Sequence, residues 1–309
     1  MHTIAAGLSY FDLNFLGRPR VIATAVVQGS RGAALVDPGP STCLETLRAT
    51  LAQQEIGIGD VRTVLLTHIH LDHAGAVGSL VRDNPEVMVY VHERGAAHMM
   101  NPTKLLASAT RLYGDDMDRL WGEVLPVPAT NIRSLAGGET IEVLDRRFEV
   151  AYLPGHASHH LGFYDRSSGV AFVGDTTGVR TGKALFAMPP TPPPDIDVEA
   201  WLESIDVVRR WQPSTLFVTH FGPHEDVAAH LDEFVEHLGG MSELARRVME
   251  QELSDDDKLQ AFTNEARLYL QRRLPPAEVA LYDFAAPLTL GWLGLRRYWR
   301  KRGVGVVGS

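Results

Sequence analysis

The stretch Thr67-His68-Ile69-His70-Leu71-Asp72-His73 directly follows an apolar run over residues 61–66. It places four metal-binding side chains within six residues, which is a poor way to stabilise a core. Imidazole and carboxylate together suit zinc, iron or manganese, and a metal held at a strand end keeps open coordination positions toward a cleft. The stretch therefore predicts a metal site where a buried strand ends.

The spacing of these side chains suggests two metal ions. His68 and His70 are two residues apart, so on extended chain they point the same way. Asp72 and His73 follow as the chain turns toward a helix predicted over residues 74–81. These two side chains can therefore aim at a neighbouring point.

Three further candidate ligands stand at the ends of strand-like runs elsewhere in the chain. His156 follows the run 148–153, Asp175 ends a run that begins at residue 170, and His220 ends a run that begins at residue 214. Each run is rich in apolar, β-branched or aromatic residues, which favours a strand. Such strand ends are expected to assemble the site along one edge of a sheet.

In this order, HxHxDH, then His, then Asp, then His, the residues resemble the metallo-β-lactamase fold superfamily of metallohydrolases over roughly residues 20 to 225. The resemblance implies an α/β fold, a four-layer αββα sandwich. It also implies a dinuclear metal centre. The implied ligands are His68, His70 and His156 for one metal, Asp72, His73 and His220 for the other, and Asp175 as the bridge between them.

The expected cofactors are two divalent metal ions, zinc first, with iron or manganese as alternatives. Two such cations about 3.5–4 Å apart can share a hydroxide, because coordination lowers the pKa of water to about 7. No serine or cysteine nucleophile is then needed, and Asp72 is the catalytic residue expected to orient the attacking oxygen. The leading hypothesis is a hydrolase of a small-molecule ester, thioester or lactone, similar to glyoxalase II or to lactonases.

Two more residues are expected to contact the ligands or the substrate. Asp37 lies near the predicted site edge and matches a family position that supports the ligands. His160 lies four residues after His156, in a GHxxxH-like stretch that family members often carry. For the neighbouring His159, an exposed position in a loop explains the residue at least as well.

Departures from the family patterns leave alternatives open. Gly178 stands three residues after Asp175, where an acyl-homoserine lactonase-like enzyme would carry Tyr. An RNase Z-like phosphodiesterase or nuclease shares the ligands but expects a basic surface. A mononuclear iron enzyme of the sulfur-dioxygenase kind would leave Asp72 or His220 without metal.

Composition fits a compact soluble enzyme, and the expected partner is the small-molecule substrate that the family resemblance implies. The chain has 309 residues, 45% of them hydrophobic, and a net charge of −9, which argues against a surface that generally coats nucleic acid. A net charge of this sign is still compatible with a local basic groove.

The single cysteine, Cys43, excludes an internal disulfide and fits a reducing compartment. No apolar run approaches the roughly 18 residues of a transmembrane segment, and the start lacks a signal peptide, so a cytoplasmic location is expected.

The chain divides into a predicted metallohydrolase domain, residues 1–223, and a C-terminal helical subdomain, residues 224–309. The second part is expected to be helical to about residue 301, with breaks at 239–240, 254 and 275–276. A proline-rich segment, 188–194, is expected to run extended over the surface, and part of the chain after Asp175 to cap the site.

Two segments have open roles. The helical insertion 93–121 either packs on the core, the favoured interpretation, or lines the cleft; its candidate wall residues are Met99, Met100, Leu105, Leu106, Tyr113 and Trp121. The basic, aromatic stretch 290–302 fits a core-packed helix with a solvated edge, a contact with an anionic substrate or nucleic acid, or a homodimer or membrane-surface contact.

Overall fold

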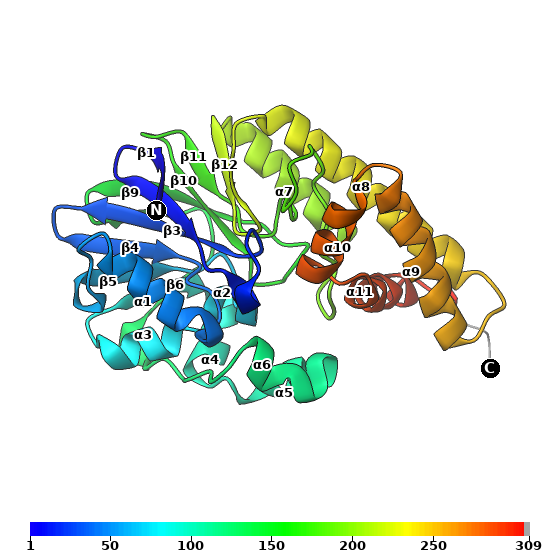
Figure 1. Cartoon of the computed structure of the whole chain (residues 1–309), viewed down its shortest axis with the longest axis horizontal. Helices are drawn as coiled ribbons and strands as arrows, with labels where there is room; N and C mark the ends of the chain where they lie inside the picture. The colour runs from blue at the N-terminus through cyan, green and yellow to red at the C-terminus, as the bar shows by residue number, and fades with distance from the viewer. Residues whose placement is uncertain (306–309) are drawn as a thin grey trace.

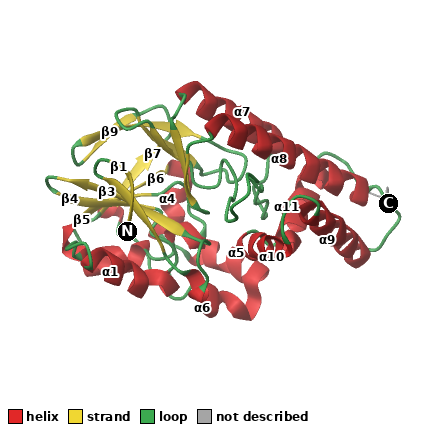
Figure 2. Ribbon diagram, turned by 45° about the horizontal axis from the view of Figure 1, so that its top comes forward, coloured by secondary structure: helices red, strands yellow, loops and turns green. Residues whose placement is uncertain are grey.

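The computed structural model describes residues 1–305 and shows two mixed β-sheets packed face to face, with helices on both outer faces (Figures 1 and 2). This four-layer αββα sandwich confirms the predicted fold class. The first sheet has the strand order β1 (His2–Ala5), β2 (Leu8–Asp12), β3 (Ala23–Gly29), β4 (Gly32–Val36), β5 (Val61–Leu65), β6 (Met88–His92) and β7 (Ile132–Leu135). Strands β1 to β4 pair antiparallel, and β4 to β7 pair parallel.

The second sheet is mostly antiparallel, with one parallel pair between β11 and β12. Its strand order is β13 (Gly222–His224), β12 (Thr215–Val218), β11 (Val170–Phe172), β10 (Leu161–Asp165), β9 (Arg146–Tyr152) and β8 (Thr140–Val143). The α-helices are α1 (Leu44–Ala52), α2 (Leu71–Ala74), α3 (Val77–Asp83), α4 (Glu93–Met100), α5 (Thr103–Tyr113), α6 (Met117–Leu120), α7 (Val198–Trp211), α8 (Val227–Met249), α9 (Asp255–Gln271), α10 (Pro276–Ala285) and α11 (Leu288–Lys301).

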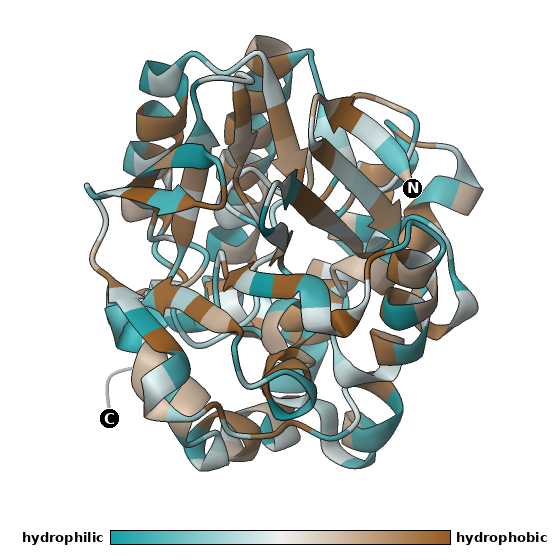
Figure 3. Ribbon diagram, turned by 90° about the vertical axis from the view of Figure 1, so that its left-hand side faces the viewer, coloured by the Kyte–Doolittle hydropathy of each residue, from teal (hydrophilic) through white to brown (hydrophobic). Residues whose placement is uncertain are grey.

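Alternation along the strands explains why each sheet buries both faces. In β3, Ala25 and Val27 belong to the hydrophobic cluster between the sheets, whereas Val26 packs with the outer helices. In β5, Val64 faces outward in the same way and Leu65 faces the partner sheet. Side chains that alternate with a period of two supply both layers at once. Figure 3 shows hydrophobic colour along many of the strands, whereas many of the outer loops are hydrophilic.

The C-terminal helices share one hydrophobic cluster with the outer face of the second sheet. Trp292 and Leu295 of α11 are fully buried in it. The predicted helix break at residues 239–240 is wrong, because α8 runs unbroken from Val227 to Met249. Leu238 and Met241, on either side of the two glycines, are buried and hold the helix against the core. The division of the chain into domains at residues 223 and 224 stays a prediction.

Most of the segment between Asp175 and α7 is buried, with Lys183, Leu185 and Pro194 exposed, so its predicted course over the surface is wrong for residues 186–191. Phe186 and Met188 are no more than 4% exposed. The reason is that α10 and α11 cover the segment: the Tyr282 hydroxyl donates to the Phe186 carbonyl (2.7 Å), and Gly294 lies so close to the backbone of Thr191 that a Cβ there would collide with it. The prolines do keep the segment free of helix, as predicted.

None of the helices within residues 1–305 combines the length and the apolar character that crossing a membrane requires. The cytoplasmic location stays a prediction.

The carboxylate of Asp165 fixes the turn between β10 and β11 and is fully buried. It accepts hydrogen bonds from the Ser167 and Ser168 hydroxyls (2.5 and 2.8 Å) and from the Arg146 guanidinium (2.5 Å). Burial alone would raise the pKa of Asp165, but these hydrogen bonds outweigh it and hold the pKa below its usual value.

Replacing Asp165 by Ala is expected to lower the free energy of unfolding by about 3 kcal/mol, because Arg146 then keeps a partly buried charge without a counter-ion. Urea denaturation at pH 7 measures this loss. Because the folded-state pKa is depressed, the stabilisation is present above the unfolded pKa of about 3.9 and is lost as the pH falls toward the folded value. Asp232→Ala, which breaks the exposed pair with Arg209, is the control and should cost less than about 1 kcal/mol. Equal losses in the two variants would contradict the conclusion that the buried carboxylate of Asp165 stabilises the fold through Arg146.

Candidate metal centre

The seven predicted ligands meet at one end of the sandwich, where four strands finish. The loops after β5, β9, β11 and β12 carry His68 and His70, His156, Asp175 and His220 respectively, and α2 carries Asp72 and His73. Three groups of these side chains have their ligand atoms within 4.8 Å of one another. The fold therefore gathers residues that are up to 152 positions apart (68 to 220) into one cluster.

The first group consists of three imidazoles whose ring nitrogens converge. The Nδ1 atom of His70 lies 2.9 Å from Nε2 of His68 and 3.0 Å from Nε2 of His156. A tetrahedral zinc ion with Zn–N bonds of 2.0–2.1 Å separates its nitrogen ligands by about 3.3 Å. Small adjustments of these rings would therefore seat one cation between them.

The second group combines two imidazoles with a carboxylate. The Nε2 atom of His220 lies 3.3 Å from Nε2 of His73 and 3.3 Å from Oδ2 of Asp72, and the remaining side, from His73 Nε2 to Asp72 Oδ2, is 3.8 Å. A mixed nitrogen and oxygen set of this size suits zinc, iron or manganese.

Asp175 lies between the two groups. Its Oδ2 atom is 3.4 Å from Nε2 of His156, whereas its Oδ1 atom is 3.3 Å from Nε2 of His73 and 3.5 Å from Nε2 of His220. Oδ1 is buried and has no hydrogen-bond partner among the described residues. A buried carboxylate oxygen without a partner is costly, and a cation on each side would remove that cost. The donor set thus fits two divalent metal ions.

Hydrogen bonds on the far side of three rings select the tautomer that a metal needs. Nδ1 of His73 donates to Asp37 Oδ2 (2.8 Å), Nδ1 of His156 to the Pro190 carbonyl (2.8 Å), and Nδ1 of His220 to the Val21 carbonyl (2.6 Å). In each ring the proton on Nδ1 leaves the Nε2 lone pair facing the cluster.

Asp37 holds this arrangement from behind and is fully buried. Besides the bond from His73, it accepts hydrogen bonds from the Thr67 backbone N–H (2.8 Å) and from the hydroxyls of Thr67 and Thr219 (both 2.7 Å). Sequence reasoning predicted Asp37 but missed the two threonines. Their signal is a Thr directly before a candidate ligand, His68 or His220, at the end of a strand.

His160 supports the loop that carries Asp175 and does not face the two candidate ligand groups with a free nitrogen. Its Nε2 atom accepts from the Asp175 backbone N–H (3.2 Å), and its Nδ1 atom lies 3.1 Å from the Thr176 hydroxyl. His159, for which an exposed loop position was expected to serve as well, is half-buried and lines the cavity above the cluster.

The electrostatics differ between the two groups. In the second group, burial would lower the pKa of His73 and His220, but the carboxylates of Asp175 and Asp72 outweigh it and raise the pKa of both rings, so a bound cation would displace protons there.

In the first group, the imidazoles are held neutral. Burial, followed by the repulsion of His156, lowers the pKa of His70 to about 4. Burial also lowers the pKa of His68, and the neighbouring imidazoles add to that effect. Burial would raise the pKa of Asp72, but His73 and His220 outweigh it and bring the pKa to about 2. Deprotonated ligands of both kinds are the forms that bind metal.

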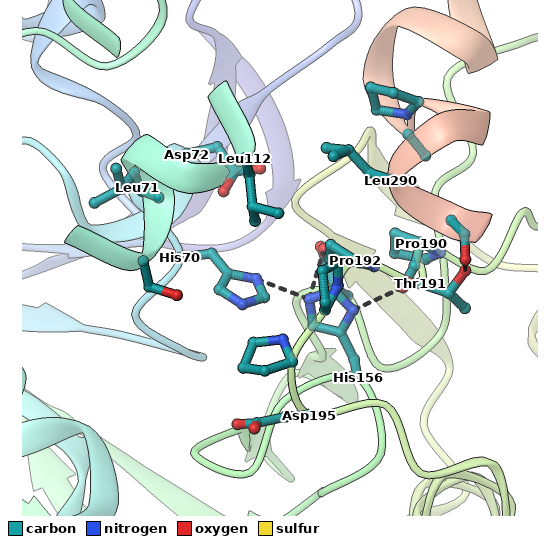
Figure 4. A pocket seen from close by; sticks show the side chains of 18 of the residues that line it. His70, Leu71, Asp72, Leu112, His156, Pro190, Thr191, Pro192, Asp195 and Leu290 are labelled. Carbon is teal, nitrogen blue, oxygen red and sulfur yellow. Dashed lines mark hydrogen bonds and ion pairs between the residues drawn. The ribbon is translucent and has the colours of Figure 1, made fainter. Parts of the chain in front are cut away.

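A cavity of about 500 Å³ opens on this cluster. Figure 4 shows His70, Asp72 and His156 exposed to it, with Leu112 of α5 on one side and Leu290 of α11 on the other. Of the six candidate wall residues in the helical insertion, Leu105, Tyr113 and Trp121 line the cavity, whereas Met99 is buried in the core, Leu106 packs against it, and Met100 is exposed.

Residues 17–220 match the Metallo-beta-lactamase superfamily. The chain belongs to this superfamily. A metallo-β-lactamase fold-containing protein of Sulfurisphaera tokodaii is 24% identical over 225 residues, which cover 72% of this chain and 78% of that protein. A hydroxyacylglutathione hydrolase of Vibrio cholerae is 31% identical over 145 residues, so the match spans 47% of this chain and only 42% of that enzyme.

The fold of this metallo-β-lactamase superfamily protein is similar to that of solved structures along almost its whole length. A metallo-β-lactamase family protein of Thermus thermophilus aligns with a TM-score of 0.73 at 23% identity, over 97% of this chain and 95% of the other. A β-lactamase domain protein of Burkholderia ambifaria aligns with a TM-score of 0.64 at 18% identity, over 95% and 87%. The shared architecture therefore includes the C-terminal helices.

Substitution of Asp175 by Asn is expected to reduce metal affinity about 100-fold or more, because it removes the charge that faces both groups. Metal content per chain after dialysis, measured by inductively coupled plasma mass spectrometry, checks this. Asp195→Asn is the matched control: Asp195 lines the same cavity but hydrogen-bonds to Ser158 (2.5 Å). Unchanged metal content in Asp175→Asn would exclude the bridging role.

The Asp37→Asn variant should lose mainly the metal bound through His73, with an affinity lowered about 10- to 100-fold, because the His73 ring loses its anionic acceptor. Titration with Zn²⁺ should then resolve one tight and one weakened site. Two sites of wild-type affinity would show that Asp37 is dispensable for orienting His73.

Proposed function

We propose that this protein is a dinuclear metal-dependent hydrolase that cleaves an ester, thioester or lactone bond of a small molecule. The observation that carries the proposal is the placement of Asp175, whose two oxygens face two separate ligand groups while Oδ1 has no partner among the described residues. The proposed ligands are His68, His70 and His156 for the first metal, Asp72, His73 and His220 for the second, and Asp175 for both.

Two divalent cations, when bound there, supply Lewis acidity and lower the pKa of a water molecule enough to make it a nucleophile at neutral pH. The side chains and backbone carbonyls of the protein orient the attacking water and the ligand rings. The side chain of Asp72 is 23% exposed, and its Oδ1 atom has no hydrogen bond within residues 1–305, so it can accept one from the attacking water. Asp37 and the Pro190 carbonyl keep His73 and His156 fixed meanwhile, which limits reorganisation during the reaction.

The dimensions of the cavity favour a small substrate. A volume of about 500 Å³ is in the usual range for ligand pockets of roughly 300–1,000 Å³. The resemblance to the Vibrio cholerae hydroxyacylglutathione hydrolase supports an acyl bond, since an acylglutathione is a thioester. Among ester, thioester and lactone bonds, this resemblance therefore favours the thioester.

The basic C-terminal stretch gives little support to a nuclease. Arg296 and Arg300 share Asp255, and Arg302 pairs with Glu199, so these three charges are partly compensated within the chain. Of the three interpretations of this stretch, a core-packed helix with a basic edge is the one that the contacts favour. For the mononuclear iron alternative, the clustering of all seven candidate ligands supports two metals instead of one.

The experiment that tests the proposal is turnover by zinc-, manganese- and iron-loaded protein on matched thioester, lactone, carboxylic ester, phosphodiester and β-lactam substrates. Metal-dependent cleavage should concentrate in the acyl bonds, and Asp175→Asn should reduce it about 100-fold or more. Preferential cleavage of the phosphodiester would overturn the proposal in favour of the nuclease class. One bound iron per chain with oxygen consumption would overturn it in favour of the oxygenase class.

A further inference from the structure

We infer that the substrate is an acyl thioester with an apolar acyl chain and a phosphate-bearing thiol as leaving group, the chemistry of an acyl-coenzyme A. The inference rests on the proposed hydrolytic function and adds the substrate class to it. It comes from the two opposite walls of the cavity, which differ in charge and in exposure. One wall is formed by α4 and α5, the other by α11 with parts of α8 and α9.

The first wall carries cations that have no ion-pair partner among the described residues. Arg94 of α4 and Lys104 and Arg111 of α5 line the cavity and are exposed, and none of them forms an ion pair within residues 1–305. Lys104, Ser108 and Arg111 follow one another at helical spacings of four and three residues, so they share one face of α5. Exposed residues that line a cavity mark its mouth. Such a face is suited to binding phosphate groups.

This charge is unexpected in a chain with a net charge of −9. The C-terminal helix is the basic stretch that stands out in the sequence, but Arg296 and Arg300 pair with Asp255, Arg302 pairs with Glu199, and Arg297 donates to the Pro194 carbonyl. On the cavity wall, the acid outside the metal cluster is Asp195, which is held by the Ser158 hydroxyl. The uncompensated positive charge of the cavity therefore lies on the α4 and α5 side.

The second wall is apolar and ends deep in the molecule. Met241 of α8, Phe262 of α9 and Leu295 of α11 line the cavity, yet each is no more than 4% exposed. Leu290 extends this wall toward the metal cluster, where Figure 4 shows it beyond Pro192 and opposite Leu112. Buried apolar residues that line a cavity mark its inner end, which suits an alkyl chain and offers no partner to a polar group.

The metal ligands lie between the two walls, so a bond cleaved there has its two products on different sides. In the reaction, the oxygen of water bonds to the acyl carbon and the carbon–sulfur bond breaks. The water supplies the proton that the sulfur takes up, and a carboxylic acid and a free thiol result. A lactone gives one product that keeps both halves joined, whereas a thioester or an ester gives one product for each wall, and the resemblance to a thioester hydrolase favours the thioester. A thioester with a charged thiol and an apolar acyl chain uses both.

Binding measured apart from turnover tests the inference. The probes are non-hydrolysable thioether analogues of butanoyl-, octanoyl- and dodecanoyl-coenzyme A, each matched with an uncharged N-acetylcysteamine analogue, titrated calorimetrically into the metal-loaded full chain. Affinity should rise from butanoyl to octanoyl by about two- to fourfold per methylene group. The coenzyme A analogues should bind at least tenfold more tightly than their uncharged counterparts.

The double variant Lys104→Glu/Arg111→Glu should weaken the octanoyl-coenzyme A analogue about tenfold or more, a much larger loss than for the uncharged analogue. The matched control is Arg147→Glu/Arg210→Glu, which changes the net charge equally at exposed positions outside the cavity. Similar losses in the two double variants would overturn the proposed phosphate contact. Leu290→Gln should weaken the dodecanoyl analogue more than the butanoyl analogue, and equal losses would overturn the acyl assignment.

Turnover then separates this inference from the proposed function. Hydrolysis of octanoyl-coenzyme A with a higher kcat/KM than the N-acetylcysteamine thioester supports both. Equal kcat/KM values would keep the hydrolase and overturn the substrate class. Tight, charge-dependent binding without metal-dependent hydrolysis would keep the ligand class and overturn the hydrolase. A preference for 1-octanoylglycerol phosphate would keep the phosphate contact and overturn the thioester.

Discussion

One buried carboxylate, Asp37, ties the two sheets together behind the candidate metal centre. It accepts hydrogen bonds from Thr67, which follows a strand of the first sheet, and from Thr219, which follows a strand of the second. Removing a charge from water costs several kcal/mol unless hydrogen bonds compensate for it. Because this compensation needs both sheets and the ring of His73, the strand ends are held in one relative position. The candidate ligands directly follow these strand ends, so their positions relative to one another are fixed as well.

The C-terminal helices act on the same centre through the proline-rich segment. The Pro190 carbonyl orients His156, and the chain next to it lies against α11, where Gly294 permits close contact with Thr191. Packing of α11 therefore affects both the orientation of a ligand ring and the shape of the cavity. The sandwich supplies the residues for the chemistry, and the helices shape what can reach them.

Charge also differs between the metal-ligand cluster and the helices around the cavity. The carboxylates and imidazoles of the cluster stabilise each other at the sheet ends, whereas the cations of α4 and α5 have no counter-charge within residues 1–305. Long, solvated side chains of this kind cost little to keep unpaired, so their arrangement around a cavity is more informative about a ligand than about stability.

The sequence by itself determined the strand ends and the candidate ligands. Alternation of apolar residues and the dense HxHxDH stretch are local features, and the residue types that bind metal are few. The tertiary structure alone decided the backbone carbonyls that orient the rings, since the bond between His220 and Val21 joins residues 199 positions apart and any residue type carries a carbonyl. It also decided which basic residues are paired. Arg296 finds Asp255 only through the packing of α11 on α9, whereas Lys104 and Arg111 face a cavity, and no local pattern distinguishes these cases because pairing depends on three-dimensional distance.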